Sequence, residues 1–260
     1  MKKNIIIMVC AIAMIMGFSA CKSKNPTATD ELLIGQIVDM EHNSRNSLDW
    51  AGTYMGVVPC ADCPGIETTV TLNQDETYTM VLRYIDRGGV FESKGTFKWN
   101  DAGSAVILTD SKDQTITHFS VGENQLIQLD TEGNVITGDL ANNYILAKVD
   151  PLLVGKRWKL VELNGKPVEK QDAFLIFDEN SSRVSGNLGC NTFTGSYFLR
   201  IGNRISFSSI AATLKMCLDM EIETGFKKVL DIADNYNVSE NSLVLNRARM
   251  APLARFELAK

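Results

Sequence analysis

The sequence contains few of the residues on which catalysis and nucleic-acid binding usually depend. Two histidines, His42 and His118, occur in 260 residues, so a histidine-based catalytic or zinc centre has little to work with. The formal charge is −5 and the basic residues form no block, which argues against nucleic-acid binding. No G-x-S-x-G, H-E-x-x-H or Walker motif is present, and the acidic residues are dispersed. These absences favour an acidic, folded protein without catalytic residues.

Long hydrophobic runs are also scarce, and the most prominent one stands at the N-terminus. Lys2 and Lys3 precede an apolar run from Ile5 to Phe18, and two small residues then lead to Cys21. A run of about 14 residues is too short for a bilayer core, which needs roughly 20. A positive start, an apolar centre and small residues before a cleavage point are typical of a secretory signal. We therefore predict that residues 1–20 are a signal peptide.

The residues around Cys21 resemble a bacterial lipoprotein signal. The match is Gly17-Phe18-Ser19-Ala20-Cys21, with Phe18 where such signals usually carry Leu. The resemblance implies that Cys21 is acylated and becomes the first residue of the mature chain, and several acyl chains would anchor it stably to a membrane. We assign residues 21–47 to the lipidated N-terminus and a tether, because the stretch after Cys21 is polar and aperiodic. As a coil, the 28 residues from Lys22 to Asp49 span roughly 30 Å.

The cysteine count points to an oxidising compartment. Of six cysteines, Cys10 leaves with the signal peptide and Cys21 is the acylation site. Four others remain, namely Cys60, Cys63, Cys190 and Cys217. An even number in an exported chain favours disulfides, and of the three possible pairings the sequence clusters favour Cys60–Cys63 and Cys190–Cys217. Loop-entropy estimates give about 2 kcal/mol for the short loop and about 3.6 kcal/mol for the long one.

Short alternating segments separated by turn residues fill the chain from Tyr54 to Val149. One segment places Ile66, Thr68, Val70 and Leu72 on one face, and a second places Tyr78, Met80 and Leu82 on one face. Strands at spacings of about 8–12 residues predict an antiparallel barrel or sandwich. We assign residues 48–150 to a small antiparallel β-barrel domain that ends at Asp150-Pro151.

Residues 151–260 form a second predicted domain, also rich in β-strands but with one main helix. Asn164-Gly165 follows an apolar segment and predicts a tight hairpin. A helix is predicted from about Met220 to Asp234 with Asp219 as its N-cap. Its apolar stripe, expected to cover a sheet, consists of Ile222, Phe226, Val229, Leu230 and Ala233. Strands are predicted at about 174–177, 183–186, 195–199, 204–208, 242–245 and 253–258. The fold class is therefore mainly β.

The segment from Pro59 to Gly65 holds the most suggestive chemistry, the pair Cys60 and Cys63. A thioredoxin-like redox pair needs its first thiol at a helix N-terminus, whereas here a β-branched strand pattern follows. Two thiolates suit Cu(I) or zinc, yet no second pair of ligands completes a zinc site, so Cys60 and Cys63 are only weak metal candidates. Met55 and Met80 could assist copper, although methionines in strands usually fill cores. The favoured interpretation is a small disulfide that pins a turn.

Several segments of the first domain resemble the NlpE N-terminal domain. They are Leu48–Tyr54, Gly56–Thr68 with its Pro59-Cys60-Ala61-Asp62-Cys63 core, Gly95–Trp99 and Ile107–Ser111. The resemblance covers about Leu48–Val149 and implies a small β-barrel in an envelope lipoprotein, in a family linked to envelope-stress and surface-contact signalling. It also implies that the CxxC pair can be disulfide-bonded. The family's copper-resistance label does not establish copper chemistry.

The second domain resembles the META/HslJ domain. The matching parts are Trp158–Leu160, Gly186–Asn191 with Thr194–Tyr197, and Thr213–Cys217. Both Cys190 and Cys217 belong to this motif, which supports their pairing. The family is associated with stress-responsive exported proteins. The NlpE proteins expected in enterobacteria carry a different C-terminal domain, so signalling attributed to that half does not carry over to this chain.

Together these features predict a non-enzymatic envelope lipoprotein that acts as a binding or sensing module in envelope stress, surface sensing and homeostasis. The expected anchor is the outer membrane, facing the periplasm, because Lys22-Ser23 offers no acidic retention signal. The expected partners are the membrane and an inner-membrane sensor protein, without nucleic acid and without a cofactor. Two alternatives stay open: Cu(I) binding by Cys60 and Cys63, and binding of an apolar ligand inside the first barrel.

Overall fold

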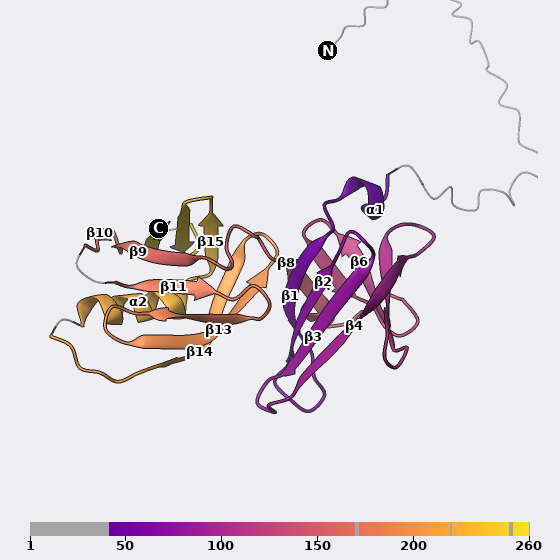
Figure 1. Ribbon diagram of the computed structural model, residues 1–260, viewed down its shortest axis with the longest axis horizontal. Coiled ribbons are helices and arrows are strands. Elements are labelled where there is room, and N and C mark those ends of the chain that lie inside the picture. Colours follow the sequence, from indigo (N-terminus) through magenta and orange to yellow (C-terminus); the bar gives the residue numbers. More distant parts are fainter. Residues whose placement is uncertain (1–41, 170–171, 219, 250–251, 260) are drawn as a thin grey trace, which may run out of the picture. The chain divides into compact units, whose positions relative to one another are not determined.

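The computed structural model describes residues 42–169, 172–218, 220–249 and 252–259 (Figure 1). The predicted signal peptide, Cys21 and most of the predicted tether lie outside the described residues. Two β-rich regions follow one another along the chain, so the predicted mainly-β fold class is confirmed. Within the described ranges, no helix has both the length and the apolar character that a bilayer crossing requires.

The first region is a closed barrel of eight antiparallel strands, each paired with the next in sequence. The last strand returns to the first, with Tyr54 opposite Lys148, and closes the ring. The predicted antiparallel barrel is thus confirmed. Its elements are β1 Gly52–Val58, β2 Ile66–Leu72, β3 Thr77–Tyr84, β4 Val90–Trp99, β5 Ala105–Asp110, β6 Ile116–Gly122, β7 Gln125–Gln128, the 3-10 helix η1 Ala141–Tyr144 and β8 Ile145–Lys148.

Strand alternation explains how this sequence fills a barrel. Inward-facing Tyr54, Val70 and Leu108 are fully buried in one apolar cluster, as successive side chains of a strand point to opposite faces. The outer face of β2 differs from a simple polar surface, because Glu67 is also buried there. Its carboxylate lies within 3.4 Å of the Ser196 hydroxyl, which donates to it from the second β-rich region.

A short helix, α1 (Ser44–Ser47), precedes the barrel and shows that the folded region begins before residue 48. The tether was expected to extend to residue 47, and this expectation is corrected by two contacts. The Arg45 amide donates to the Gly103 carbonyl at 3.0 Å, and the Ser44 hydroxyl donates to the Val121 carbonyl at 2.6 Å. A capping box built by Asn43 and Asn46 satisfies the free amides of this helix.

The second region is a nine-stranded antiparallel sheet that also closes on itself, because β9 pairs with β17. Asn164 and Gly165, with φ of 51° and 77°, connect β9 to β10 as the tight hairpin that this dipeptide predicts. Its elements are β9 Arg157–Leu163, β10 Lys166–Pro167, β11 Phe174–Phe177, β12 Arg183–Asn187, β13 Thr192–Arg200, β14 Arg204–Ala212, α2 Glu221–Ile232, β15 Asn235–Val238, β16 Ser242–Asn246 and β17 Ala254–Leu258.

Helix α2 buries the predicted apolar stripe against this sheet. Phe226, Val229 and Leu230 are at most 1% exposed and belong to the core of the second region. The helix starts at Glu221, and its N-cap is Met220, whose side chain makes no capping hydrogen bond. The expected N-cap, Asp219, lies outside the described residues. Acidic residues in the first turn favour the start of the helix instead, since they face the positive end of its dipole.

The two β-rich regions share a packed contact. Met55 of β1 and Ala147 of β8 point outward from the first barrel and join the buried cluster of the second region. The Tyr197 hydroxyl of β13 lies 3.6 Å from the Met55 sulfur and donates to the Asp178 carbonyl at 3.0 Å. The part of the barrel's outer face that carries Met55 and Ala147 therefore belongs to a core rather than to free surface.

Candidate functional site at two disulfide-bonded loops

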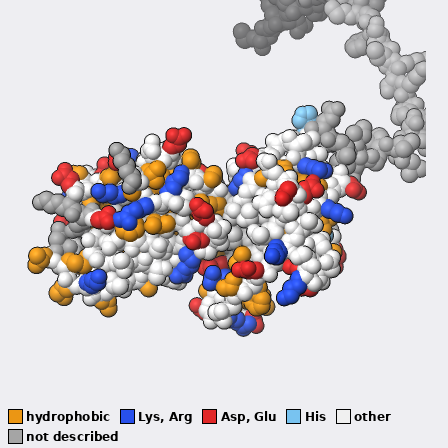
Figure 2. All heavy atoms as spheres, viewed as in Figure 1, with side chains coloured by type: hydrophobic (Ala, Val, Ile, Leu, Met, Phe, Trp, Pro, Cys, Tyr) orange, Lys and Arg blue, Asp and Glu red, His pale blue; other side chains and the backbone are white. Residues whose placement is uncertain are grey.

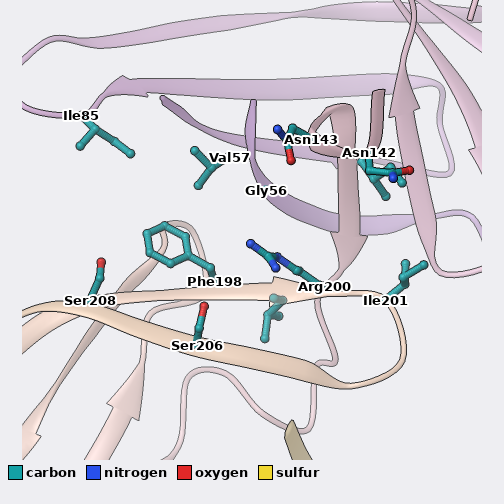
Figure 3. Close-up of a pocket in the computed structure, with 12 residues that line it drawn as sticks. Gly56, Val57, Ile85, Asn142, Asn143, Phe198, Arg200, Ile201, Ser206 and Ser208 are labelled. Atoms are coloured by element: carbon teal, nitrogen blue, oxygen red, sulfur yellow. The ribbon is translucent and has the colours of Figure 1, made fainter. Parts of the chain in front are cut away.

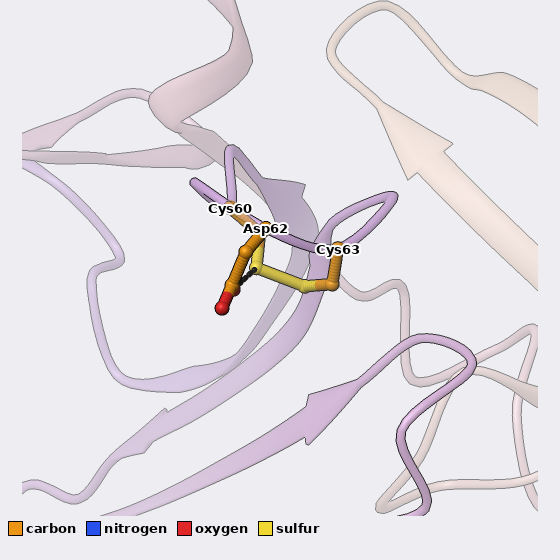
Figure 4. A group of neighbouring side chains, drawn as sticks. All are labelled: Cys60, Asp62 and Cys63. Carbon is orange, nitrogen blue, oxygen red and sulfur yellow. Dashed lines mark hydrogen bonds between the residues drawn. A yellow bond between two sulfur atoms is a disulfide. The ribbon is translucent and has the colours of Figure 1, made fainter.

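Cys60 and Cys63 lie in the turn between β1 and β2, where the chain leaves one strand and enters the next. Their sulfurs are joined at 2.06 Å, as the sequence clusters favour (Figure 4). Gly65 follows because a side chain there would clash: a Cβ atom would lie 2.5 Å from a methyl group of Val57. No helix follows Cys63, so the chain offers no helix dipole to stabilise a thiolate.

The neighbouring β3–β4 turn holds this loop through Arg87. Its guanidinium donates to the Asp62 carbonyl oxygen at 2.8 Å and pairs with an Asp62 carboxylate oxygen, also at 2.8 Å. Both side chains are about half exposed, at 49% and 64%. The other Asp62 oxygen lies 3.5 Å from the Cys60 sulfur, the dashed contact in Figure 4. The loop thus presents a small polar surface of one cation, one anion and a disulfide.

Cys60, Asp62 and Cys63 are also the group of potential metal ligands found among the described residues, with their ligand atoms within 4.8 Å of one another. Thiolates, not disulfide sulfurs, are the ligands that bind soft metals. In the oxidised state, the two sulfurs are bonded to each other. The group then offers a single exposed carboxylate as a charged ligand. The donor set therefore fits Cu(I) only after reduction.

The second loop runs from Cys190, after β12, to Cys217, before α2, and its sulfurs are joined as well. It encloses strands β13 and β14, whereas the first disulfide encloses only two residues. The bond joins the start of β13 to the chain that leaves β14, and both lie near the helix N-terminus. This position makes the second disulfide a link between three elements.

Asn191, the residue after Cys190, is the centre of a buried hydrogen-bond network. Only 1% of it is exposed. Its amide oxygen accepts from the Thr213 hydroxyl and the Lys215 amide, both at 2.7 Å. Its amide nitrogen donates to the Lys215 carbonyl at 2.9 Å and to the Glu223 carboxylate at 3.0 Å. One side chain therefore fixes the backbone of the loop on both sides of Lys215 and ties it to α2.

A pocket of about 560 Å³ opens where the β-rich regions meet (Figure 3). Val57 and Ile85 line it from the first region, and Phe198 and Arg200 from the β13–β14 hairpin. Its lining contains no acidic residue, histidine or cysteine. The pocket therefore offers apolar surface, amide and hydroxyl groups and one positive charge, which suits docking more than proton transfer.

Glu67 borders the same contact and is the most perturbed carboxyl there. Burial raises its pKa, and the nearby Arg83, the Ser196 hydroxyl and Arg183 oppose that rise without cancelling it. The Arg83 guanidinium lies 3.6 Å from the carboxylate. Since the neutral acid is favoured relative to an exposed glutamate, this group responds to mild acidification.

The predicted site residues thus fall into separate places. Cys60 and Cys63 form one loop and Cys190 and Cys217 another, whereas Cys21 lies outside the described residues. His118 lies on β6 and is partly buried. The sequence analysis missed Asn191 as a network centre and Arg87 as the partner of Asp62. Asn191 belongs to the Gly186–Asn191 segment that resembles the META/HslJ domain, but its side-chain hydrogen bonds reach residues more than 20 positions away.

Comparison with protein families agrees with the two regions. Residues 54–139 match the family described as NlpE N-terminal domain, and residues 151–260 match the family described as META domain. The two matched stretches follow one another in the order that the sequence motifs predict.

Individual relatives match parts of the chain. Lipoprotein NlpE of Escherichia coli strain K12 is 33% identical over 141 residues, which are 53% of this chain and 55% of that protein. The chain thus matches about half the length of this relative. A solved candidate lipoprotein from Shewanella oneidensis is 48% identical, covers 41% of this chain and 94% of its own, and has a TM-score of 0.37. The Cpx pathway activator NlpE from Escherichia coli is 24% identical, with coverage of 56% and 84% and a TM-score of 0.31.

Proposed function

We propose that this chain, which joins an NlpE N-terminal domain to a META domain, is a non-enzymatic envelope lipoprotein that senses or binds in the response to envelope stress. The single observation that carries this proposal is the NlpE domain match at residues 54–139. Lipoprotein NlpE of Escherichia coli, a Cpx pathway activator by name, is the relative from which the stress-sensing role is drawn.

The surfaces of the described residues support a role in docking. The Cys60–Cys63 loop presents a polar surface, and the pocket beside Arg200 offers apolar walls and one cation. In this proposal Cys21 is acylated, the chain resides in the outer membrane facing the periplasm, and an inner-membrane sensor protein is its partner. A chain stalled during transport would remain near that sensor, so its position would report the fault.

The anchor is tested by replacing Cys21. We expect wild-type protein to incorporate a clickable palmitate analogue and to fractionate with membranes, whereas Cys21→Ala loses the label. The replaced protein should move from the washed membrane fraction to the periplasmic extract once its signal peptide is removed. An unlabelled wild type, or a processed Cys21→Ala protein that stays fully with membranes, would contradict the anchor.

The sensing role needs a separate readout. Overproduction of the wild type is expected to raise transcription of envelope-stress genes in the source bacterium. A matched control is Ala61→Ser, a small change at an exposed position of the same loop, which should behave like the wild type. Equal transcription with and without overproduction, at matched protein levels, would contradict the sensing role.

Copper binding is the second candidate function, and the observation in its favour is the closeness of Cys60, Asp62 and Cys63. It requires the reduced pair. Anaerobic Cu(I) titration after reduction should then show stoichiometric binding that Cys60→Ser/Cys63→Ser removes. Equal, weak binding by both proteins would leave the disulfide as a structural bond only.

A further inference from the structure

Three large apolar side chains stand in solvent on the segment between β14 and α2. Leu214, Met216 and Leu218 are 99%, 96% and 111% exposed relative to an extended reference. Figure 2 shows apolar side chains along this segment, at the lower left. The other large apolar side chains that are exposed among the described residues range from 47% to 65%. This segment is therefore the most exposed apolar surface in the described part of the chain.

The three side chains occupy alternate positions, and the fold fixes which way they face. In an extended segment, residues two apart lie on the same side. Cys217, between Met216 and Leu218, is bonded to Cys190 of the folded body, whereas both of its neighbours are exposed. We call Leu214, Met216 and Leu218 the apolar row.

The row is held in place rather than loosely attached. Asn191 binds both the amide and the carbonyl of Lys215, which lies between Leu214 and Met216. The Thr213 amide also donates to the Thr192 carbonyl at 3.0 Å. A braced segment loses less conformational entropy on binding than a mobile one, so its apolar contacts contribute more to affinity.

Leaving such a row in water has a measurable cost. Moving a Leu or Met side chain from water into an apolar environment is favourable, in proportion to the apolar area removed from water. Exposed large apolar side chains that gather on one short segment point to an interaction site for a protein or a membrane. A partner that covers all three side chains removes their apolar area from water, and this burial favours binding.

We propose that the apolar row inserts into the interfacial layer of a phospholipid bilayer. This inference rests on the proposed function, because an acylated Cys21 would keep the chain near a membrane. Even fully extended, the 21 residues from Lys22 to His42, before the cap of α1, reach at most about 75 Å. Attachment at that range raises the effective concentration of lipid around the row and adds to the row's own affinity for the bilayer.

The chemistry of the row favours lipid over a protein groove. Thr213–Leu218 contains no Trp, Tyr or Arg, the residues that dominate protein–protein hot spots. Leu and Met fit between acyl chains, and Lys215 can extend its amine toward lipid phosphates. Among the described acidic residues near the row, Glu223 binds Asn191 and Glu221 pairs with Lys166. Insertion is therefore driven by apolar contact, with charge as a minor contribution.

Vesicle flotation tests the row without relying on the anchor. The mature chain from position 21, with Cys21→Ala, is mixed with phosphatidylethanolamine/phosphatidylglycerol vesicles at a 3:1 ratio, and in parallel with phosphatidylcholine vesicles. We expect Leu214→Ser/Met216→Ser/Leu218→Ser to reduce the floated fraction at least tenfold on both. The matched control Ile116→Ser/Val135→Ser/Leu140→Ser changes exposed apolar positions of the first region. Its floated fraction should stay within twofold of that of the protein whose apolar row is unchanged.

A second variant keeps the test independent of any folding defect. Met216→Trp should bind at least as well and should shift its fluorescence to the blue when vesicles are added. Absence of flotation, equal flotation of the triple variant, or binding confined to anionic vesicles would each overturn the proposal. The proposal would also be overturned if the row were not needed for vesicle binding but were required for crosslinking to an envelope protein. Because the protein tested lacks the acylation site, these results are independent of the Cys21 labelling test.

Discussion

The Cys60–Cys63 loop and the Cys190–Cys217 loop differ in length, in polarity and in what supports them. The first encloses two residues, exposes Asp62 and is held from outside by Arg87. The second encloses two long strands, exposes an apolar row and is held from inside by the buried Asn191. Both use the same covalent bond, yet only the second joins elements that are distant in sequence.

The contribution of a disulfide to stability therefore depends on what it encloses. A short loop has little conformational freedom to lose, so its closure stabilises the fold modestly. A long loop that also contains a buried polar network ties strand, loop and helix together. We therefore expect changes in the second loop to affect the free energy of unfolding most, and changes in the first to affect mainly its surface.

The largest expected effect comes from removing the long-range bond. Cys190→Ala/Cys217→Ala should lower the free energy of unfolding of the second region by about 3.6 kcal/mol, against about 2 kcal/mol for Cys60→Ala/Cys63→Ala in the first. Hydrogen exchange resolved by segment measures both regions in one protein. The two double variants serve as controls for each other, and a larger loss from the short loop would reverse the comparison.

The buried network should come next. Asn191→Ala removes hydrogen bonds to Thr213, Lys215 and Glu223 and leaves buried polar groups without these partners. A cost of about 2–3 kcal/mol is expected, typical of an unsatisfied buried group. Urea unfolding monitored by circular dichroism gives the value. Asn187→Ala is a matched control, since Asn187 is partly buried and accepts one local bond from the Gly189 amide. Equal losses for both would contradict the role of Asn191.

The same contrast shows what sequence can and cannot predict. Local signals succeeded: the alternation at Val70 and Leu72 placed a strand, and Asn164-Gly165 placed a hairpin. The stripe at Phe226 and Leu230 placed the helix, because its spacing is set by 3.6 residues per turn. Strand β15 was missed, since its sequence Asn-Tyr-Asn-Val has the polar character of a loop.

The features of the site that were missed depend on contacts distant in sequence. Asn191 was noticed as part of a motif, but its partners lie 22 to 32 residues away. Leu214 and Met216 are indistinguishable in sequence from core residues, and only the fold shows them exposed. Arg87 meets Asp62 because two turns lie at the same end of the barrel, which pairing of β2 with β3 determines.

A smaller effect is expected at the support of the first loop. Arg87→Ala removes an exposed ion pair and one hydrogen bond to the Asp62 carbonyl. Exposed ion pairs contribute about 0–1 kcal/mol, and salt screens them. Urea unfolding at low and high salt should show a difference below about 1 kcal/mol that shrinks as salt rises. A loss comparable to that of Asn191→Ala would mean that the first loop is supported as strongly as the second.

The smallest effect is expected from a contact between the strands next to the two loops, and this effect depends on pH. Glu67 follows the first loop, and Ser196 lies inside the second. Because burial raises the pKa of Glu67 above its ordinary value of 4.5, the folded protein binds this proton more tightly than the unfolded chain. The stabilisation by the proton is complete below pH 4.5 and is lost as the pH rises through the folded-state pKa.

Glu67→Gln imitates the protonated acid at every pH. The variant should therefore be more stable than wild type at pH 7, by less than about 1 kcal/mol, the net contribution of an ordinary hydrogen bond. The difference should vanish as the pH falls to 4.5. Urea unfolding at four pH values between 4 and 7 measures it, with Glu92→Gln on the exposed β4 surface as the control. A variant less stable than wild type at pH 7 would show instead that the Arg83 pair outweighs the cost of burying the charge.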